Sequence, residues 1–379
     1  MKRISKYRVE YTILVPLFIM AIISISSIFS AQNLLTSAFN SLAIKQTMWF
    51  IIGLALSYSI MFLRNEFLER NAWMLYGIGV LSLFLLLFFA TPVNGSKCWF
   101  VIPGIGNIQP SEFMKVFLII INASIIHKFN ETAKTTKDEF FLILKILLIT
   151  GIPAILTFMQ PDTGAAIIYF VISTIMLLIS GIKLRWFVIG FLLIGLVLGT
   201  TLFLFFNNQD LFIKIFGTNI FYRLDRLFDW RTGSGMQLEN SLIAIGSAGL
   251  FGHGFANTPI YFPEPQADFI FAVFASNWGL FGSLGLILLL LGFDIKLIHL
   301  GVKSTNDVSK YIIAGIVGML LFQQLQNIGM TMGILPIMGI TLPFISYGGS
   351  SLLSYMIIVG LIFNISNDNL RFMNKKNLL

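Results

Sequence analysis

One stretch of the chain reads Trp186-Phe-Val-Ile-Gly-Phe-Leu-Leu-Ile-Gly-Leu-Val-Leu-Gly-Thr-Thr-Leu-Phe-Leu-Phe-Phe-Asn207 and contains no Asp, Glu, Lys or Arg. A helix needs about 20 mainly apolar residues to cross the hydrocarbon core of a bilayer, so this stretch predicts a transmembrane helix. Nine further stretches of similar character predict nine more. The ten predicted spans are 11–30, 46–63, 72–91, 112–129, 140–158, 164–182, 186–207, 268–298, 311–333 and 349–367.

The composition of the whole chain agrees with a membrane protein. Of its 379 residues, 56% are hydrophobic and 11% are charged, whereas about 25% of the residues of a soluble domain are charged. A soluble core stops growing at roughly 250–300 residues and cannot bury so much apolar surface. The same composition excludes a disordered chain. We therefore predict an all-α, polytopic membrane protein with a single domain, residues 1–379.

Basic residues predict the orientation, because cytoplasmic loops are enriched in Lys and Arg. The chain holds 25 of them. With both termini in the cytoplasm, 18 fall on the inner side and seven on the outer side, four of these seven within one long segment. We therefore predict cytoplasmic termini. The net charge of +8 is attributed to this orientation and not to a nucleic-acid partner.

The outer side is predicted to carry the function. Nine of the eleven prolines fall in outer segments, where they favour turns. The longest outer segment, about 208–267, is predicted to be a large extracellular loop between helices 7 and 8, and loops of that length are usually functional or disordered. Its part Ser241-Leu-Ile-Ala-Ile-Gly-Ser-Ala-Gly-Leu-Phe251 is too apolar for disorder and predicts an amphipathic or re-entrant element.

Three ionisable residues fall at the outer ends of predicted spans. Glu112 and Lys115 share one face of the fourth predicted helix, since they are three residues apart. Asp162 lies in the outer turn between the fifth and sixth helices, at a depth from which it can reach Lys115. Charges at membrane depth are costly, so by default they indicate a functional site in which each charge has a partner. Two interpretations therefore stay open, an ion cluster that locks three helices together and a cluster that holds a ligand.

Asp268 opens the eighth predicted span after a proline-containing segment. A partly desolvated carboxylate at the membrane boundary can have the raised pKa that suits a general base. The alternative is an Asp that caps the N-terminus of a helix. Arg223, Arg226 and Arg231 in the long loop are candidates for binding a phosphate of an outward-facing ligand, or they face solvent and lipid headgroups.

The last outer segment predicts a cavity. The stretch 338–351 is rich in glycine and is predicted to be irregular, and irregular backbone at membrane depth must be buried in protein or line a cavity. The polar walls of that cavity are predicted to include Ser346, Tyr347, Ser350 and Ser351. Cysteine and histidine do not indicate an intramolecular disulfide or a metal site, because Cys98 is the only cysteine and the three histidines lie far apart in sequence.

Seven stretches of the sequence, taken together, resemble motifs of the shape, elongation, division and sporulation family of RodA, FtsW and SpoVE. They appear in the family's order over most of the chain and look closest to the RodA branch. The stretches are Gln109-Pro-Ser-Glu-Phe-Met-Lys115, Gln160-Pro-Asp-Thr-Gly164, Tyr222-Arg-Leu-Asp-Arg226, Ser241-Leu-Ile-Ala-Ile-Gly246 with Gly249-Leu-Phe-Gly252, Asp268-Phe-Ile-Phe-Ala-Val273, Asn327-Ile-Gly-Met330 and Pro343-Phe-Ile-Ser-Tyr-Gly-Gly-Ser-Ser351.

The resemblance implies a peptidoglycan glycosyltransferase with ten helices that polymerises lipid II at the outer face of the cytoplasmic membrane. It implies an essential role for Asp268 and functional roles for Glu112, Lys115 and Asp162. It also implies a class B penicillin-binding protein as partner, within the complex for elongation, division or sporulation. The chain departs from the family pattern at Gln266, where the family commonly has His, so the surroundings of the carboxylate are altered.

We hypothesise an inverting reaction in which lipid II is both donor and acceptor and Asp268 is the base. The pyrophosphate leaving group needs charge stabilisation more than it needs an acid. The candidates for that role are Lys115, Arg223 and Arg226, together with a divalent cation such as Mg or Mn. Two other functions stay open at this point. One is a lipid II flippase or another transporter, and the other is a non-catalytic scaffold of a cell-wall complex.

Overall fold

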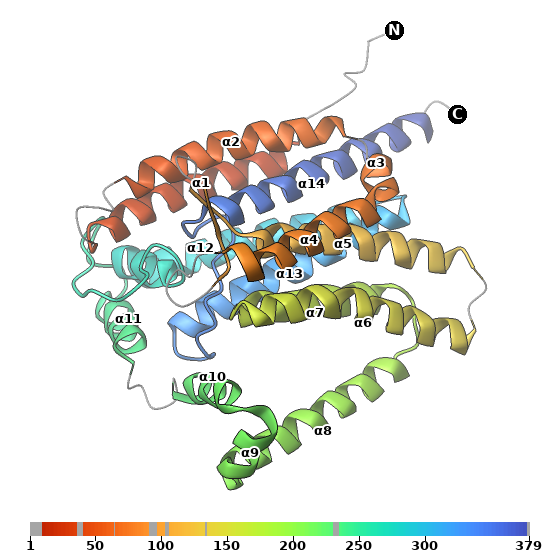
Figure 1. Ribbon diagram of the computed structural model, residues 1–379. Coiled ribbons are helices and arrows are strands. Elements are labelled where there is room, and N and C mark those ends of the chain that lie inside the picture. Colours follow the sequence, from red (N-terminus) through yellow and green to blue (C-terminus); the bar gives the residue numbers. More distant parts are fainter. Residues whose placement is uncertain are drawn as a thin grey trace.

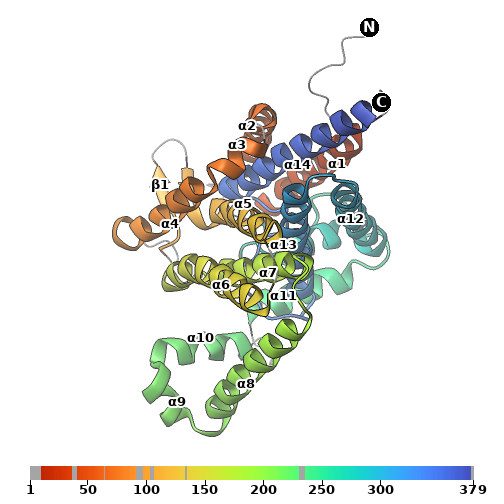
Figure 2. The same ribbon diagram turned by 90° about the vertical axis from the view of Figure 1, so that its right-hand side faces the viewer.

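The computed structural model describes residues 10–35, 41–63, 65–90, 97–102, 106–132, 135–229 and 235–376. These ranges hold 14 helices and one antiparallel pair of short strands (Figures 1 and 2). In chain order, the elements are α1 (Tyr11–Gln32), α2 (Leu42–Phe62), α3 (Asn65–Arg70), α4 (Ala72–Phe89), β1 (Phe100–Ile102), β2 (Gly106–Ile108), α5 (Pro110–Asn130), α6 (Thr136–Met159), α7 (Thr163–Ile179), α8 (Arg185–Asn207), α9 (Gln209–Phe216), α10 (Thr218–Asp229), α11 (Met236–Ser247), α12 (Ile270–Val302), α13 (Asp307–Thr331) and α14 (Gly349–Lys376).

The all-α membrane fold predicted from the sequence is confirmed. Each of the ten predicted spans coincides with a helix. Among the described residues, eight helices are long and apolar enough to cross a membrane, namely α1, α2, α4, α6, α8, α12, α13 and α14. The other two predicted spans are α5, which carries two charged residues at its start, and α7, an apolar helix of 17 residues. The count of ten spans stays a prediction.

Helices α5, α13 and α14 form the centre of the bundle. Helix α13 packs against α5, α7 and α12, while α14 packs against α2 and α5. Figure 2 shows α8 leaving this bundle and continuing into α9 and α10, which stand apart from the other helices. In α8, which is described throughout, Phe205 is the one buried residue. The apolar surface of α8 is therefore available to lipid.

Helix α12 is broken at Gly279, whose backbone angles (φ 63°, ψ −159°) are not helical. The loop after α11 fills the break. Leu280 N donates to Gly249 O at 3.0 Å, and Gly254 N donates to Asn277 O at 3.1 Å. The polar backbone groups that the break releases are thus satisfied inside the protein, as a spanning helix in hydrocarbon requires.

The long segment predicted as one extracellular loop contains three helices, α9, α10 and α11. The apolar element expected near residues 241–251 corresponds to the end of α11 and the turn after it. Its Ser241 Oγ donates to Thr331 O at 3.0 Å, which ties α11 to the end of α13. The extracellular location of the segment stays a prediction.

Replacing Gly279 tests the break in α12. A Cβ at this position would lie 2.4 Å from Gly252 N, and a positive φ strains a residue with a side chain by about 1–3 kcal/mol. Gly279→Ala is therefore expected to lower the thermal unfolding temperature in detergent. Gly285→Ala is the matched control, because a Cβ there would meet nothing within 4 Å. An unchanged unfolding temperature in Gly279→Ala would contradict this account of the break.

Candidate active site

A cavity of about 1390 Å³ lies among α2, the β1–β2 hairpin, the start of α5 and the loops that precede α7, α12 and α14. These elements meet at the end of the bundle predicted to face outward. Among the described residues, four carboxylic acids from three parts of the chain line the cavity: Glu112, Asp162, and the pair Glu264 and Asp268 in the loop before α12. Tyr347, Ser350 and Ser351 line it as well, which confirms the predicted polar wall for these three residues.

Asp268 lies in the loop before α12 and is partly buried. The N-cap of α12 is Phe269, so the structure does not place Asp268 at the capping position. The backbone carbonyl of Asp268 instead accepts a hydrogen bond from Asn327 Nδ2 at 2.8 Å. The same amide nitrogen donates to Ile340 O at 2.7 Å. Asn327 of α13 thereby holds the Asp268 loop against the irregular segment before α14.

Ser346 also holds the Asp268 loop in place, through hydrogen bonds of its hydroxyl. Its hydroxyl donates to Ala267 O at 2.7 Å and accepts from Leu342 N at 2.8 Å. The next residue, Tyr347, donates its backbone N–H to Gln266 O at 2.8 Å. Two consecutive residues before α14 thus fix the two residues that precede the carboxylate. Of the pair, Tyr347 faces the cavity, and the described lining of the cavity does not include Ser346.

The electrostatic surroundings of Asp268 favour a basic carboxylate. Burial, and after it the nearby charges of Glu264 and Asp162, together raise the pKa of Asp268 to about 7. A pKa near the working pH makes an ionised carboxylate an effective acceptor of protons. The raised pKa inferred from the sequence therefore has a structural cause in burial and in two neighbouring acids.

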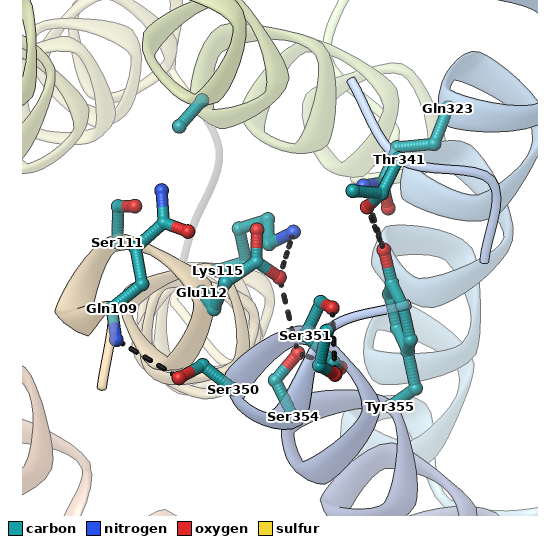
Figure 3. A network of polar contacts seen from close by, with 12 residues as sticks. Gln109, Ser111, Glu112, Lys115, Gln323, Thr341, Ser350, Ser351, Ser354 and Tyr355 are labelled. Carbon is teal, nitrogen blue, oxygen red and sulfur yellow. Dashed lines mark hydrogen bonds and ion pairs between the residues drawn. The ribbon is translucent and has the colours of Figure 1, made fainter. Parts of the chain in front are cut away.

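Glu112 and Lys115 form an ion pair, with Nζ 2.7 Å from Oε2 (Figure 3). Lys115 is fully buried, and its ammonium lies 5.4 Å from the ring centre of Tyr355. Ser354 of α14 also approaches the Glu112 carboxylate, at 3.5 Å. Glu112 reaches the cavity wall, whereas Lys115 stands behind it. A buried charge of this kind requires its partner.

Asp162 joins the start of α7 to the start of α5. One carboxylate oxygen accepts from Ala165 N at 3.0 Å, which caps α7. The other accepts from Gln109 Nε2 at 2.9 Å and from Ser111 Oγ at 3.1 Å. The carboxylate thus bonds to the residues around the helix start, while the ion-pair partner of Lys115 is Glu112. Both interpretations of the cluster stay open, since it links helix starts and its two acids also line the cavity.

The predicted arginines are placed only in part. Arg223 and Arg226 lie in α10, but their side chains are outside the described residues, and so is Arg231 altogether. The part of the chain that the structure describes holds no group of three or more His, Cys, Asp or Glu residues able to bind a metal ion. The divalent cation expected from the sequence stays a prediction.

Sequence reasoning missed Lys45 and Trp49 of α2. Both line the cavity, and Lys45 is the one Lys or Arg among the described lining residues. A signal was present, because Lys45 is one of the few basic residues on the predicted outer side. Gln323 and Thr341 were missed as well, and they line the cavity where Tyr355 approaches them (Figure 3).

A family model described as "Cell cycle protein", for FtsW, RodA and SpoVE, matches residues 8–370. The chain belongs to the FtsW/RodA/SpoVE family. A probable peptidoglycan glycosyltransferase FtsW from Coxiella burnetii is 34% identical over 339 residues, 86% of each chain. The protein with the same name from Bacillus subtilis is 35% identical over 298 residues, which are 76% of this chain and 72% of the Bacillus protein.

Solved structures share the fold of this family member. RodA from Thermus thermophilus matches with a TM-score of 0.69 and 24% identity over 96% of this chain and 97% of that one. A chain from a structure titled "Structural coordination of polymerization and crosslinking by a peptidoglycan synthase complex" matches with a TM-score of 0.79 and 23% identity over 96% and 98%. The assignment to the RodA branch stays a prediction, since the two curated relatives described above carry the name FtsW.

The ion pair is testable by a double-mutant cycle. Lys115→Met leaves the Glu112 carboxylate without its partner at a partly desolvated site, and it should lower the free energy of unfolding by about 3–5 kcal/mol. The double variant Glu112→Gln/Lys115→Met should be more stable than Lys115→Met alone. Thermal and denaturant unfolding in detergent measure the stability of the two single variants and of the double variant. Strictly additive effects of the two substitutions would show that the pair is not coupled.

Proposed function

We propose that this family member is a peptidoglycan glycosyltransferase that polymerises lipid II at the outer face of the cytoplasmic membrane. The observation that carries the proposal is Asp268, a carboxylate with a raised pKa on the wall of a large cavity that Glu112, Asp162 and Glu264 also line. The names of the relatives support the same activity. At about 1390 Å³ the cavity is larger than the roughly 300–1,000 Å³ of usual small-molecule sites, so it has room for a large sugar substrate.

In the proposed reaction, the Asp268 carboxylate takes the proton from the 4-hydroxyl of the acceptor's GlcNAc. The oxygen then forms a bond to C1 of the lipid-linked MurNAc, and the bond from C1 to the pyrophosphate oxygen breaks with inversion. The electron pair leaves with undecaprenyl pyrophosphate. One base is enough for this step, since pyrophosphate departs without a proton.

The departing pyrophosphate needs positive charge nearby. Lys45 supports this role by its place on the cavity wall. Arg223 and Arg226 remain candidates for the same role on sequence grounds. The burial of Lys115 and its pairing with Glu112 favour a different role, in which it holds the Glu112 carboxylate in place. Glu112, Asp162, Ser346 and Tyr347 complete the proposed site.

The proposal extends to a partner. One structural neighbour comes from a peptidoglycan synthase complex that coordinates polymerization and crosslinking. A class B penicillin-binding protein is the partner that we propose for this chain, since crosslinking is the reaction that follows polymerisation. We further propose that the pair serves cell-wall elongation and cell shape, with division or sporulation as the other settings for the same chemistry.

Removing the base tests the activity. Asp268→Asn should abolish the polymer that purified protein and its partner make from lipid II, because the amide cannot accept the proton. Loss of general-base catalysis lowers rates by about 10²–10⁴-fold. Gel analysis of the glycan products measures this, with Asp210→Asn in α9 as a control outside the cavity. Full activity in Asp268→Asn would remove the proposed base, and wild-type protein without product would return transport and scaffolding to consideration.

The pH dependence supplies a second test. Because only the ionised carboxylate accepts a proton, the rate should fall about tenfold per pH unit below the pKa of Asp268, which is about 7. Glu264→Gln removes a negative charge that raises this pKa. Its acid limb should therefore move to lower pH. An acid limb that stays in place in Glu264→Gln, or a flat profile in the wild type, would contradict the assignment.

A further inference from the structure

The irregular segment between α13 and α14 contributes backbone as well as side chains to the wall of the cavity. Residues 338–341 line the cavity. Gly339 is exposed there, and its φ is 65°. It also adjoins the proposed base, because a Cβ at this position would lie 3.5 Å from Asp268 Oδ2. The backbone of the segment therefore lies beside the carboxylate at which the reaction is proposed to occur.

The N–H of Gly339 is available to a ligand in the cavity. Met338 O lies against the start of α7, where a Cβ at the buried Gly164 would be 2.7 Å from that oxygen. In a trans peptide, the N–H points in the direction opposite to the preceding C=O. The Gly339 N–H therefore points away from α7. Because Gly339 lines the cavity and has no side chain to cover its amide, a ligand can reach this N–H.

Thr341 repeats the arrangement two residues later. Ile340 O accepts from Asn327 Nδ2 of α13 at 2.7 Å, so the Thr341 N–H points away from Asn327. Thr341 also lines the cavity. Among the described residues, neither Gly339 N nor Thr341 N donates a hydrogen bond to another protein atom. Backbone N–H groups are strong donors that normally have a partner, so these two can bind oxygen atoms of a ligand.

The charges around the segment decide which kind of oxygen it binds. Gly339 adjoins Asp268, and three further acids line the same cavity among the described residues. Like charges repel, so a phosphate at Gly339 would be disfavoured by the ionised Asp268 carboxylate. Lys45, also on the cavity wall, is the better place for a phosphate. The N–H groups therefore favour a neutral acceptor, such as the carbonyl oxygen of an amide.

We propose that the Gly339 N–H binds the carbonyl oxygen of the 2-acetamido group of the lipid-linked MurNAc, with the Thr341 N–H as a second donor to the same sugar. This inference rests on the proposed function. The acetamido group is attached to C2, next to the C1 atom that the acceptor hydroxyl attacks. Binding it beside Asp268 holds C1 where the deprotonated hydroxyl can reach it. The segment thereby selects N-acetylated sugars.

Replacing one amide by an ester tests the inference. Glycolic acid, introduced at position 339 by nonsense suppression, changes the Gly339 N–H to an ester oxygen and adds no side chain. Binding is measured in nanodiscs with lipid II that lacks the 4-hydroxyl of GlcNAc, because this probe cannot react as an acceptor. The ester should raise the Kd of the probe about three- to tenfold through the loss of one hydrogen bond. The Kd should not change for the same probe without the MurNAc acetamido group.

An ester at Ile337 is the matched control in the same segment. The preceding carbonyl, Pro336 O, accepts from Gln326 Nε2 at 2.7 Å, and Ile337 is not among the described residues that line the cavity. This ester should leave the Kd of both probes unchanged. In the Gly339 ester, an equal loss of affinity for both probes, or no loss for either, would overturn the inference. Because neither probe reacts, the expected Kd pattern in a protein that makes no polymer would support the subsite while the proposed activity fails.

Discussion

The site depends on one constraint, which is that irregular backbone at membrane depth cannot face lipid and must find its hydrogen bonds inside the protein or along a cavity. The segment between α13 and α14 is irregular, and three helices satisfy it. Ser24 Oγ of α1 donates to Ile345 O at 2.8 Å, and Gln46 Nε2 of α2 donates to Ser346 O at 3.2 Å. Asn327 of α13 binds the same segment at Ile340. These buried polar side chains hold open a cavity that regular helices would fill.

The same logic governs the charges beside the cavity. A desolvated ammonium is stable only when a carboxylate accompanies it, and Glu112 supplies that carboxylate to Lys115. Asp162 gains its stability from hydrogen-bond donors at two helix starts. In the described surroundings of Asp268, its backbone is held by Asn327, while burial and the neighbouring acids raise the pKa of its side chain. Glu112 and Asp162, whose carboxylates have partners, thus stabilise the structure around the cavity. Asp268, which has other acids as neighbours, is the proposed reactive group.

The sequence predicted the helices well because lipid imposes length and apolarity on every span. It also singled out Asp268, Glu112 and Asp162, since charges at membrane depth are rare enough to stand out. It could not show how each helix is rotated, because helices surrounded by lipid and protein are apolar on all sides and lack a polar stripe. That is why Lys115 was a candidate for the pyrophosphate, whereas the structure places its side chain behind the cavity wall.

The break in α12 was beyond sequence reasoning for another reason. Gly279 is one of several glycines in its span, and nothing local distinguishes it. What makes the break is the close approach of Gly252, which is a contact between segments far apart in the chain. The division of the long outer segment into α9, α10 and α11 likewise depends on contacts such as the one between Ser241 and Thr331.

The central claim is that Asp268 accepts the proton of the attacking sugar hydroxyl. A structure of the protein in nanodiscs, bound to a lipid II analogue whose acceptor hydroxyl is retained, tests this claim most directly. The account predicts the 4-hydroxyl oxygen of the acceptor sugar at about 2.6–3.2 Å from the Asp268 carboxylate, directly or through one water. A bound sugar whose hydroxyl faces Glu112 or Asp162, with Asp268 out of reach, would contradict the account.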